Sequence, residues 1–113
     1  MKFATIHKFA MSLPETTEAP HHHFSSFRVR GKIFVTIPPD QKFLHLFIPE
    51  FEREQALAMY PEFVEKLFWG GKVLGIKVTL ADADTATVKM LVRQAWEYKA
   101  PKALQEKPRK PTE

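Results

Sequence analysis

The chain has 113 residues, of which 44% are hydrophobic and none is cysteine. This length suits one domain, and the hydrophobic content is enough to build a buried core without disulfide bonds. The absence of cysteine excludes thiolate nucleophiles and cysteine-ligated zinc or iron–sulfur sites. Seventeen Lys and Arg against thirteen Asp and Glu give a formal net charge of +4, which suits an anionic partner without identifying one.

The N-terminal segment does not resemble a targeting signal. It is largely apolar, but His7 and Lys8 interrupt it and no small-residue cleavage site follows. The chain contains no run of about 18 apolar residues, so we expect no membrane-spanning segment. We therefore expect a cytoplasmic protein.

The first third of the chain predicts a helix followed by a hairpin. Apolar residues recur at three-to-four residue spacing over residues 3–13, which predicts a helix that Pro14 ends. The polar residues 15–20 are expected to form a connecting loop. Residues 24–37 are rich in β-branched and aromatic side chains, with Gly31 placed to form a tight turn, and they predict two antiparallel strands.

Strand alternation predicts the direction of the hairpin side chains, since neighbouring residues point to opposite faces. The residues expected to face inward are Phe27, Val29, Ile33, Val35 and Ile37. Arg28 and Arg30 are then expected to point outward.

The middle of the chain predicts a third strand and a second helix. A proline-rich turn over residues 38–41 precedes the strand-like residues 42–48. Helix-forming residues 50–60 follow, with acidic side chains in the first turn and Pro61 after the last residue. Residues 63–69 are apolar and fit either a short strand or an irregular edge.

The last elements are a strand and a helix. Residues 74–80 alternate between apolar and polar or small side chains, which is typical of a half-buried strand. Asp84 is then expected to cap a helix that reaches Tyr98. The order is typical of an α+β fold, a two-layer sandwich of α-β(3)-α-β(2)-α type, in which an antiparallel sheet carries helices on one face. We expect one domain over residues 1–104 and a flexible basic tail over residues 105–113.

A histidine run suggests a metal site without specifying one. His21 and His23 would share a face of an extended segment and could chelate a metal with a third ligand from His45 or His7. No histidine or glutamate motif with zinc-enzyme spacing accompanies them, so an exposed polar loop is the favoured interpretation and no metal or cofactor is expected.

The remaining polar residues do not form a catalytic motif. The carboxylates Asp82 and Asp84, and the group at residues 50–54, fall at expected helix starts, where they would cap free N–H groups. The serines lie outside any nucleophile elbow, and the Gly70-Gly71 pair lacks the rest of a phosphate-binding loop. We therefore expect a protein that is not an enzyme.

Charge is distributed unevenly along the chain. Residues 28–42 carry a local charge of +3, residues 50–66 carry −3 and residues 99–113 carry +3. Such clusters suit contacts with nucleic-acid phosphates, although a solvated outer strand face would show the same residues. The candidate nucleic-acid-binding residues are Arg28, Arg30, Lys32, Lys42, Lys72, Lys77 and Lys102.

The chain resembles the MmcQ/YjbR family of small bacterial proteins over about residues 3–104. The similar features are Ser-Leu-Pro at residues 12–14, S-F-R-V-R-G-K-I-F from Ser26, Pro49-Glu50, the closing helix from Asp84 with Ala95-Trp96, and Ala100-Pro101-Lys102. The resemblance implies a fold related to secretion-chaperone-like and frataxin-like proteins, and a DNA-binding role through a double-wing arrangement. The resemblance implies no catalytic residues for this chain.

Two functions follow as hypotheses. The first is DNA binding through the basic hairpin and tail, with Phe34 or Trp69 available for stacking on bases. The alternative is a protein-interaction or chaperone-like module that docks a partner on Phe63, Phe68 and Trp69. The oligomeric state stays open.

Overall fold

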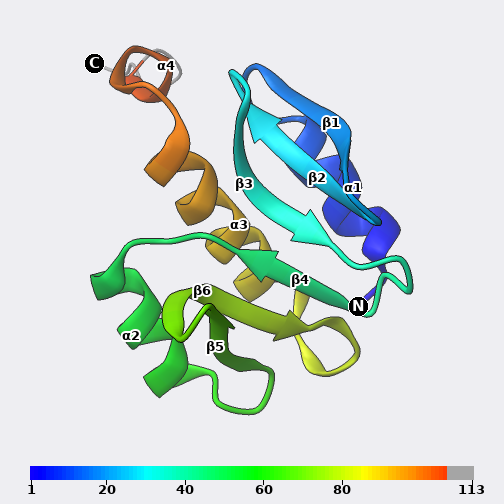
Figure 1. The fold of residues 1–113 in the computed structure, drawn as a ribbon, viewed down its shortest axis with the longest axis vertical. Coiled ribbons are helices and arrows are strands. Elements are labelled where there is room, and N and C mark those ends of the chain that lie inside the picture. Colours follow the sequence, from blue (N-terminus) through cyan, green and yellow to red (C-terminus); the bar gives the residue numbers. More distant parts are fainter. Residues whose placement is uncertain (107–113) are drawn as a thin grey trace.

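The computed structural model describes residues 1–106 (Figure 1). Its helices are α1 (Phe3–Met11), α2 (Glu50–Met59), α3 (Thr85–Lys99) and α4 (Lys102–Glu106), with a short 3-10 turn at Leu80–Asp82. Its strands are β1 (Thr16–His21), β2 (Phe24–Val29), β3 (Lys32–Ile37), β4 (Phe43–Leu46), β5 (Val64–Trp69) and β6 (Lys72–Thr79).

The strands form one six-stranded antiparallel sheet in the order β1-β2-β3-β4-β6-β5. The α+β class is confirmed, and so are the helices at residues 3–13, 50–60 and 84–98 to within a few residues. Residues 63–69, which fitted two interpretations, contain the edge strand β5.

The predicted loop over residues 15–20 is wrong, and the expected three strands before α2 are four. These residues contain β1, which pairs with β2 from Thr16 opposite Val29 to His21 opposite Phe24. Edge strands are often polar and can include proline, because one side of the backbone needs no partner. Strand β1 therefore lacks the apolar alternation that marks a half-buried strand.

A β-bulge changes the inward face of β3. The register places Val35 opposite Phe27 but Ile33 opposite Arg28, so β3 contributes Phe34 as one extra residue. Phe34 is fully buried, with its ring centroid 6.5 Å from that of Phe27. The prediction that Ile33 points inward is therefore wrong, and so is the suggestion that Phe34 is free to stack on a base.

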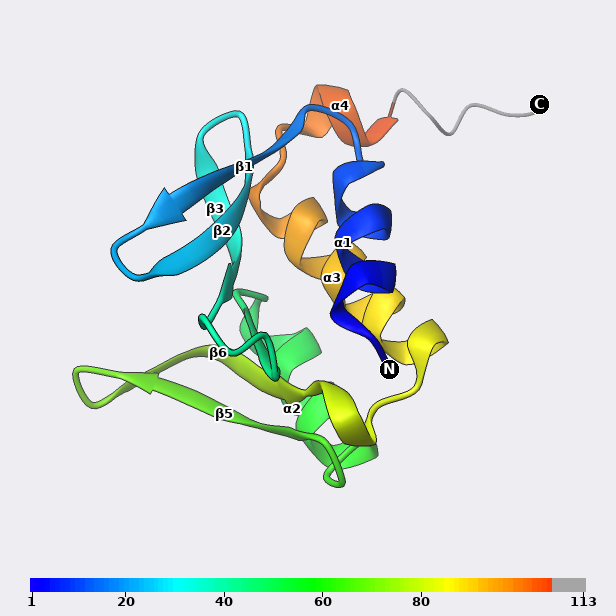
Figure 2. The same cartoon turned by 90° about the vertical axis from the view of Figure 1, so that its right-hand side faces the viewer.

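The core lies between the sheet and the helices on one side of it. Figure 2 shows α1 and α3 together on that side; α3 packs against β3 and β4, and α2 packs against β5 and β6. Trp96 of α3 is buried, and its indole N–H donates to the carbonyl oxygen of Pro14 at 3.1 Å, which ties α3 to the segment that follows α1. The opposite side of the sheet, which we call the free face, carries neither α1 nor α3.

The ordered structure at the C-terminal end reaches past residue 104, where the flexible tail was expected to begin. Helix α4 includes residues 105 and 106, and Gln105 donates to the carbonyl oxygens of Glu97 and Ala100, each at 2.8 Å. The remainder of the expected tail, residues 107–113, lies outside the described residues. Within residues 1–106, no helix is long and apolar enough to cross a membrane.

Candidate nucleic-acid interface

A row of polar side chains crosses the free face. The register aligns Ser26 of β2 with Thr36 of β3, Thr36 with His45 of β4, and His45 with Lys77 of β6. Directly opposed residues on neighbouring strands point to the same face. We call these four residues the polar row, and Glu65 of β5 continues it beyond Lys77.

Arg28 lies beside one end of the polar row. It is half-buried between the inward residues Phe27 and Val29, as predicted for an outward side chain. Its Nε donates to Ser26 Oγ at 3.0 Å, and its Nη2 donates to the carbonyl oxygen of Pro20 at 3.1 Å. These two bonds fix the guanidinium and leave its other N–H groups for further acceptors.

The other end of the row combines an imidazole with an ammonium group. Thr36 Oγ1 lies 3.3 Å from His45 Nδ1, and the Lys77 Nζ lies 4.2 Å from the centroid of the Phe43 ring. Partial burial of the imidazole and the nearby Lys77 charge lower the pKa of His45. The lowered pKa favours the neutral form of the imidazole and leaves Lys77 as the charged group at this end of the row.

The predicted basic hairpin is less cationic than its sequence indicates. Arg30 occupies the turn with φ 49°, and its Nε and Nη2 donate to the two carboxylate oxygens of Glu15 at 2.7 and 3.1 Å. Glu15 immediately precedes β1, the strand that the sequence did not predict. Glu15 lies outside residues 28–42, so the local charge of +3 for that segment does not include this neutralising carboxylate.

The β5–β6 hairpin carries two neighbouring exposed aromatic side chains. Trp69 is 76% exposed and Phe68 is 60% exposed, next to a turn formed by Gly70 and Gly71 at φ 58° and 81°. Lys72 lies directly across from Trp69 in the ladder. A cation and an indole are thus neighbours at the tip of a hairpin.

The remaining predicted cations do not gather into one patch. Both views place the β2–β3 turn and α4 at one end of the molecule, and the β5–β6 turn away from it. The end with the β2–β3 turn and α4 carries Lys32 and Lys102, whereas Lys42 lies just before β4. Within residues 1–106, none of these three and neither Lys72 nor Lys77 lies within ion-pair distance of a carboxylate.

The two hairpin tips project on the same side. Figure 2 shows the β1–β2 and β5–β6 turns extending away from α1 and α3, one at each end of the sheet's free face. The β1–β2 turn contains His22 and His23, and it is the feature that corresponds to the predicted histidine loop. The free face therefore lies between two projecting hairpins.

The histidines do not converge on a metal site in the described part of the chain. His7 Nε2 lies 2.8 Å from Glu18 Oε1, while the rings of His21 and His22 lie against each other. Among residues 1–106, no group of three or more histidine, aspartate or glutamate side chains is placed to hold a metal ion.

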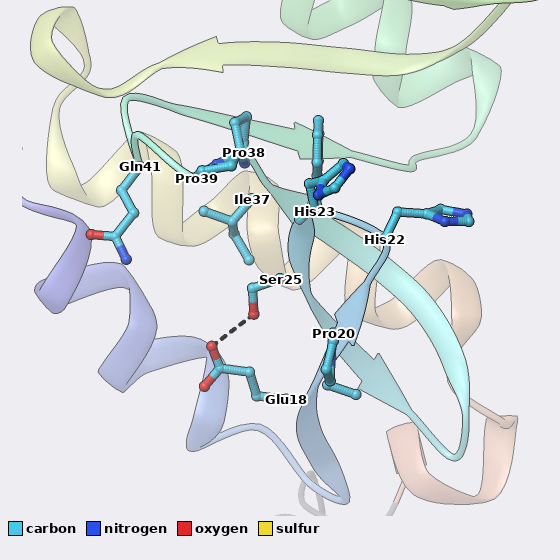
Figure 3. A pocket seen from close by; sticks show the side chains of 11 residues that line it. Glu18, Pro20, His22, His23, Ser25, Ile37, Pro38, Pro39 and Gln41 are labelled. Atoms are coloured by element: carbon cyan, nitrogen blue, oxygen red, sulfur yellow. Dashed lines mark hydrogen bonds between the residues drawn. The ribbon is translucent and has the colours of Figure 1, made fainter.

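An open depression lies beside the β1–β2 turn (Figure 3). It has a volume of about 600 Å³, and its lining residues are Glu18, Ala19, Pro20, His22, His23, Phe24, Ser25, Ile37, Pro38, Pro39 and Gln41. Figure 3 shows the imidazoles of His22 and His23 pointing away from the hydrogen bond between Ser25 and Glu18. The polar groups therefore do not converge on a bound molecule.

Glu18 forms the centre of a small hydrogen-bonded network at this depression. Ser25 Oγ donates to Glu18 Oε2 at 2.9 Å, while Glu18 Oε1 binds His7. In a serine hydrolase the imidazole lies between the hydroxyl and the carboxylate. Here the carboxylate lies between them, so the three side chains link α1, β1 and β2 without activating the serine.

Comparison with known proteins identifies the family. The YjbR family profile matches residues 11–98, which is more than three quarters of the chain. Neither the curated proteins nor the solved structures searched gave a match. The match covers α1's last residue, the whole six-stranded sheet and nearly all of α3. This chain belongs to the YjbR family.

Proposed function

We propose that the protein is a non-enzymatic, nucleic-acid-binding domain that contacts phosphates from the free face and its flanking hairpins. One observation carries the proposal: Trp69 and Lys72 face each other across the ladder at the tip of the projecting β5–β6 hairpin. An exposed indole beside an ammonium group that has no carboxylate partner in the described part of the chain supplies both a stacking surface for a base and a charge for a phosphate.

The free face supplies further cations on the same side. Arg28 and Lys77 flank the polar row, and neither is paired with a carboxylate within residues 1–106. The proposed contact surface therefore differs from the hairpin that the sequence favoured. It includes Arg28, Lys72 and Lys77, while Arg30 is held by Glu15.

Fluorescence anisotropy with a labelled oligonucleotide tests the proposal. Binding is expected to weaken linearly with salt on logarithmic axes from about 50 to about 300 mM, because phosphate contacts release counterions. The double variant Trp69→Ala/Lys72→Ala is expected to weaken binding about tenfold, since both a stacking contact and a charge are lost. Both side chains are exposed, so this variant keeps the fold.

The matched control removes an exposed charge from the helix side. Lys8 lies on α1 and is exposed, so Lys8→Ala changes the net charge as Lys72→Ala does but leaves the free face intact. Its affinity is expected to stay close to that of the wild type. Equal losses in both variants would mean that net charge alone attracts the oligonucleotide, and absence of binding at low salt would refute the proposal.

Protein docking is a second candidate, favoured by the apolar side chains of the same hairpin. Phe68, Trp69 and Leu74 are exposed. Phe63, which the predicted docking set included, is buried, so that part of the prediction is wrong. An exposed cluster of this kind is typical of an interaction surface. Docking predicts that Phe68→Ser reduces association with another protein without changing the salt dependence of oligonucleotide binding.

A further inference from the structure

We propose that His45, held by the buried Thr36, and Lys77 form a phosphate site at the centre of the free face, and that its ligand is single-stranded nucleic acid laid across β3, β4 and β6. This inference rests on the proposed function and adds the position of the site and the type of strand. It places the binding centre on the sheet itself, between the hairpin tips.

The register brings three polar side chains of different elements together. Thr36, His45 and Lys77 are successive cross-strand neighbours on β3, β4 and β6. The Lys77 ammonium can donate hydrogen bonds to a phosphate oxygen, and so can His45 Nε2–H when the Thr36 hydroxyl donates to Nδ1. Thr36 itself is buried, so it orients the imidazole and does not contact the phosphate. With Nδ1 near Thr36, the His45 ring has its Nε2 available for a ligand.

Lys77 has a fixed position but no carboxylate partner among residues 1–106. Its ammonium lies over the Phe43 ring at 4.2 Å, which stabilises the cation through the ring quadrupole and limits its motion. Glu65, its cross-strand neighbour on β5, is not within ion-pair distance. The charge of Lys77 is therefore available to an external anion.

Aromatic rings beside the cations favour a single strand as the ligand. The Phe24 ring centroid lies 5.8 Å from that of His45, and the Phe43 ring lies under Lys77. Proteins that bind unpaired strands alternate aromatic surfaces with cations, because unpaired bases can stack on rings while phosphates meet the charges. In a duplex the bases are already stacked on one another and give these rings little to contact.

The length of the row suits several nucleotides. From Ser26 on β2 to Lys77 on β6 the row crosses three strand spacings, which is about 14 Å at about 4.8 Å each. Stacked nucleotides rise by about 3.4 Å each along a strand. Arg28 and Lys77, at opposite ends of the row, can therefore contact different phosphates of one strand.

The imidazole gives the site a measurable signature. The charged group that faces His45 is Lys77 on β6, with Glu65 beyond it on β5. Thr36 on β3 is neutral, and Arg28 lies at the far end of the row beside Ser26. Burial and Lys77 lower the pKa of His45, whereas a phosphate bound beside it would favour the protonated ring. Binding should therefore take up a proton, and affinity should rise as the pH falls from about 8 to about 6.

The experiment measures anisotropy of a labelled oligothymidylate of about 15 nucleotides and of the matching duplex. Lys77→Gln is expected to weaken single-strand binding at least about fivefold and to reduce the salt slope by about one. Lys77→Arg keeps the charge and should restore most of the affinity. His45→Gln should retain binding at about pH 8 and lose the increase toward about pH 6.

Matched controls separate this site from general charge effects. His23→Gln removes an exposed histidine from the β1–β2 turn, and Lys8→Ala removes a charge from the helix side. Both variants should keep the pH dependence and the salt slope of the wild type, with only a small change in the affinity itself. Thermal unfolding of each variant confirms that the fold is retained.

The outcomes distinguish the two proposals. If the wild type binds and Trp69→Ala/Lys72→Ala weakens binding while Lys77→Gln and His45→Gln do not, the proposed function stands and this site is wrong. If duplex binds as tightly as the single strand, the choice of a single strand is overturned. If the wild type binds neither, the proposed function falls and this site falls with it.

Discussion

Arg30 donates two hydrogen bonds to Glu15, at 2.7 and 3.1 Å, and these bonds join the β2–β3 turn to the start of β1. The pairing combines a guanidinium fork with a carboxylate, a geometry that is stronger than a single contact. It also neutralises one of the three cations in the hairpin from which the sequence predicted DNA binding.

Replacement of Glu15 should therefore strengthen nucleic-acid binding. Glu15→Gln removes a negative charge and releases Arg30, so we expect the affinity to rise about two- to threefold and the salt slope to increase. Anisotropy across a salt series measures both quantities. Glu97→Gln is the matched control, because Glu97 pairs with Arg93 on α3, on the helix side of the sheet. An equal rise in the control would contradict a local role for Arg30.

The two tryptophans should respond differently to the same substitution. Trp96→Phe removes a buried indole and leaves the carbonyl of Pro14 without its donor, so the free energy of unfolding should fall by about 2 kcal/mol. Trp69→Phe changes an exposed side chain and should leave stability nearly unchanged. Urea denaturation measures both variants, and equal midpoints for the two would contradict the assigned positions.

Gly75 should tolerate no side chain. A methyl group there would overlap the carbonyl oxygen of Leu46 on the neighbouring strand. Gly75→Ala must therefore shift the backbone, and we expect a loss of about 3 kcal/mol in the free energy of unfolding. Gly31→Asn is the contrasting variant, because Gly31 lies in open space at φ 82° and asparagine accepts this conformation better than most residues. The prediction fails if Gly75→Ala is the milder of the two.

Acid should weaken the link between α1 and the sheet. The hydrogen bond to His7 is the main cause that lowers the pKa of Glu18 from its ordinary value of 4.5, and the Ser25 bond adds to it. The unfolded chain therefore takes up a proton at Glu18 before the folded chain does, and stability falls as the pH drops below about 4.5. The Glu18 side chain is 38% exposed, so solvent screens the interaction and the effect should be small.

Urea denaturation at about pH 7 and about pH 3.5 checks this sign. The midpoint of the wild type should fall more than that of Glu18→Gln, which has no titrating group at this position. Asp40→Asn controls for the removal of a carboxylate from an exposed loop. A larger fall in Glu18→Gln would contradict the assigned network.

Most of the fold could be predicted from local patterns. The helices at residues 50–60 and 84–98 have clear start and stop signals, and the structure confirms that Asp84 caps α3 by accepting from the backbone N–H of Thr87 at 3.0 Å. Strand β1 could not be predicted in this way, because a polar edge strand has no apolar alternation and is held by its pairing with β2. The burial of Phe34 was also missed, because a bulge changes which face a residue occupies.

The candidate site depended even more on non-local relationships. The sequence identified Arg28 and Lys77 as cations, but their relation to Ser26, Thr36 and His45 follows only from the register of four strands. The pairing of Arg30 with Glu15 likewise depends on the presence of β1. The expectation that Trp69 is available for stacking agrees with its position, since its side chain is exposed beside Gly70.

Chemical-shift mapping by two-dimensional NMR tests the account most directly, because it locates the bound strand residue by residue. On titration with oligothymidylate, we predict shifts concentrated at Thr36, His45, Lys77 and the β5–β6 tip, with α1 and the outer surface of α3 unchanged. Shifts confined to α1 and α3, or no shifts at low salt, would contradict nucleic-acid binding by the free face.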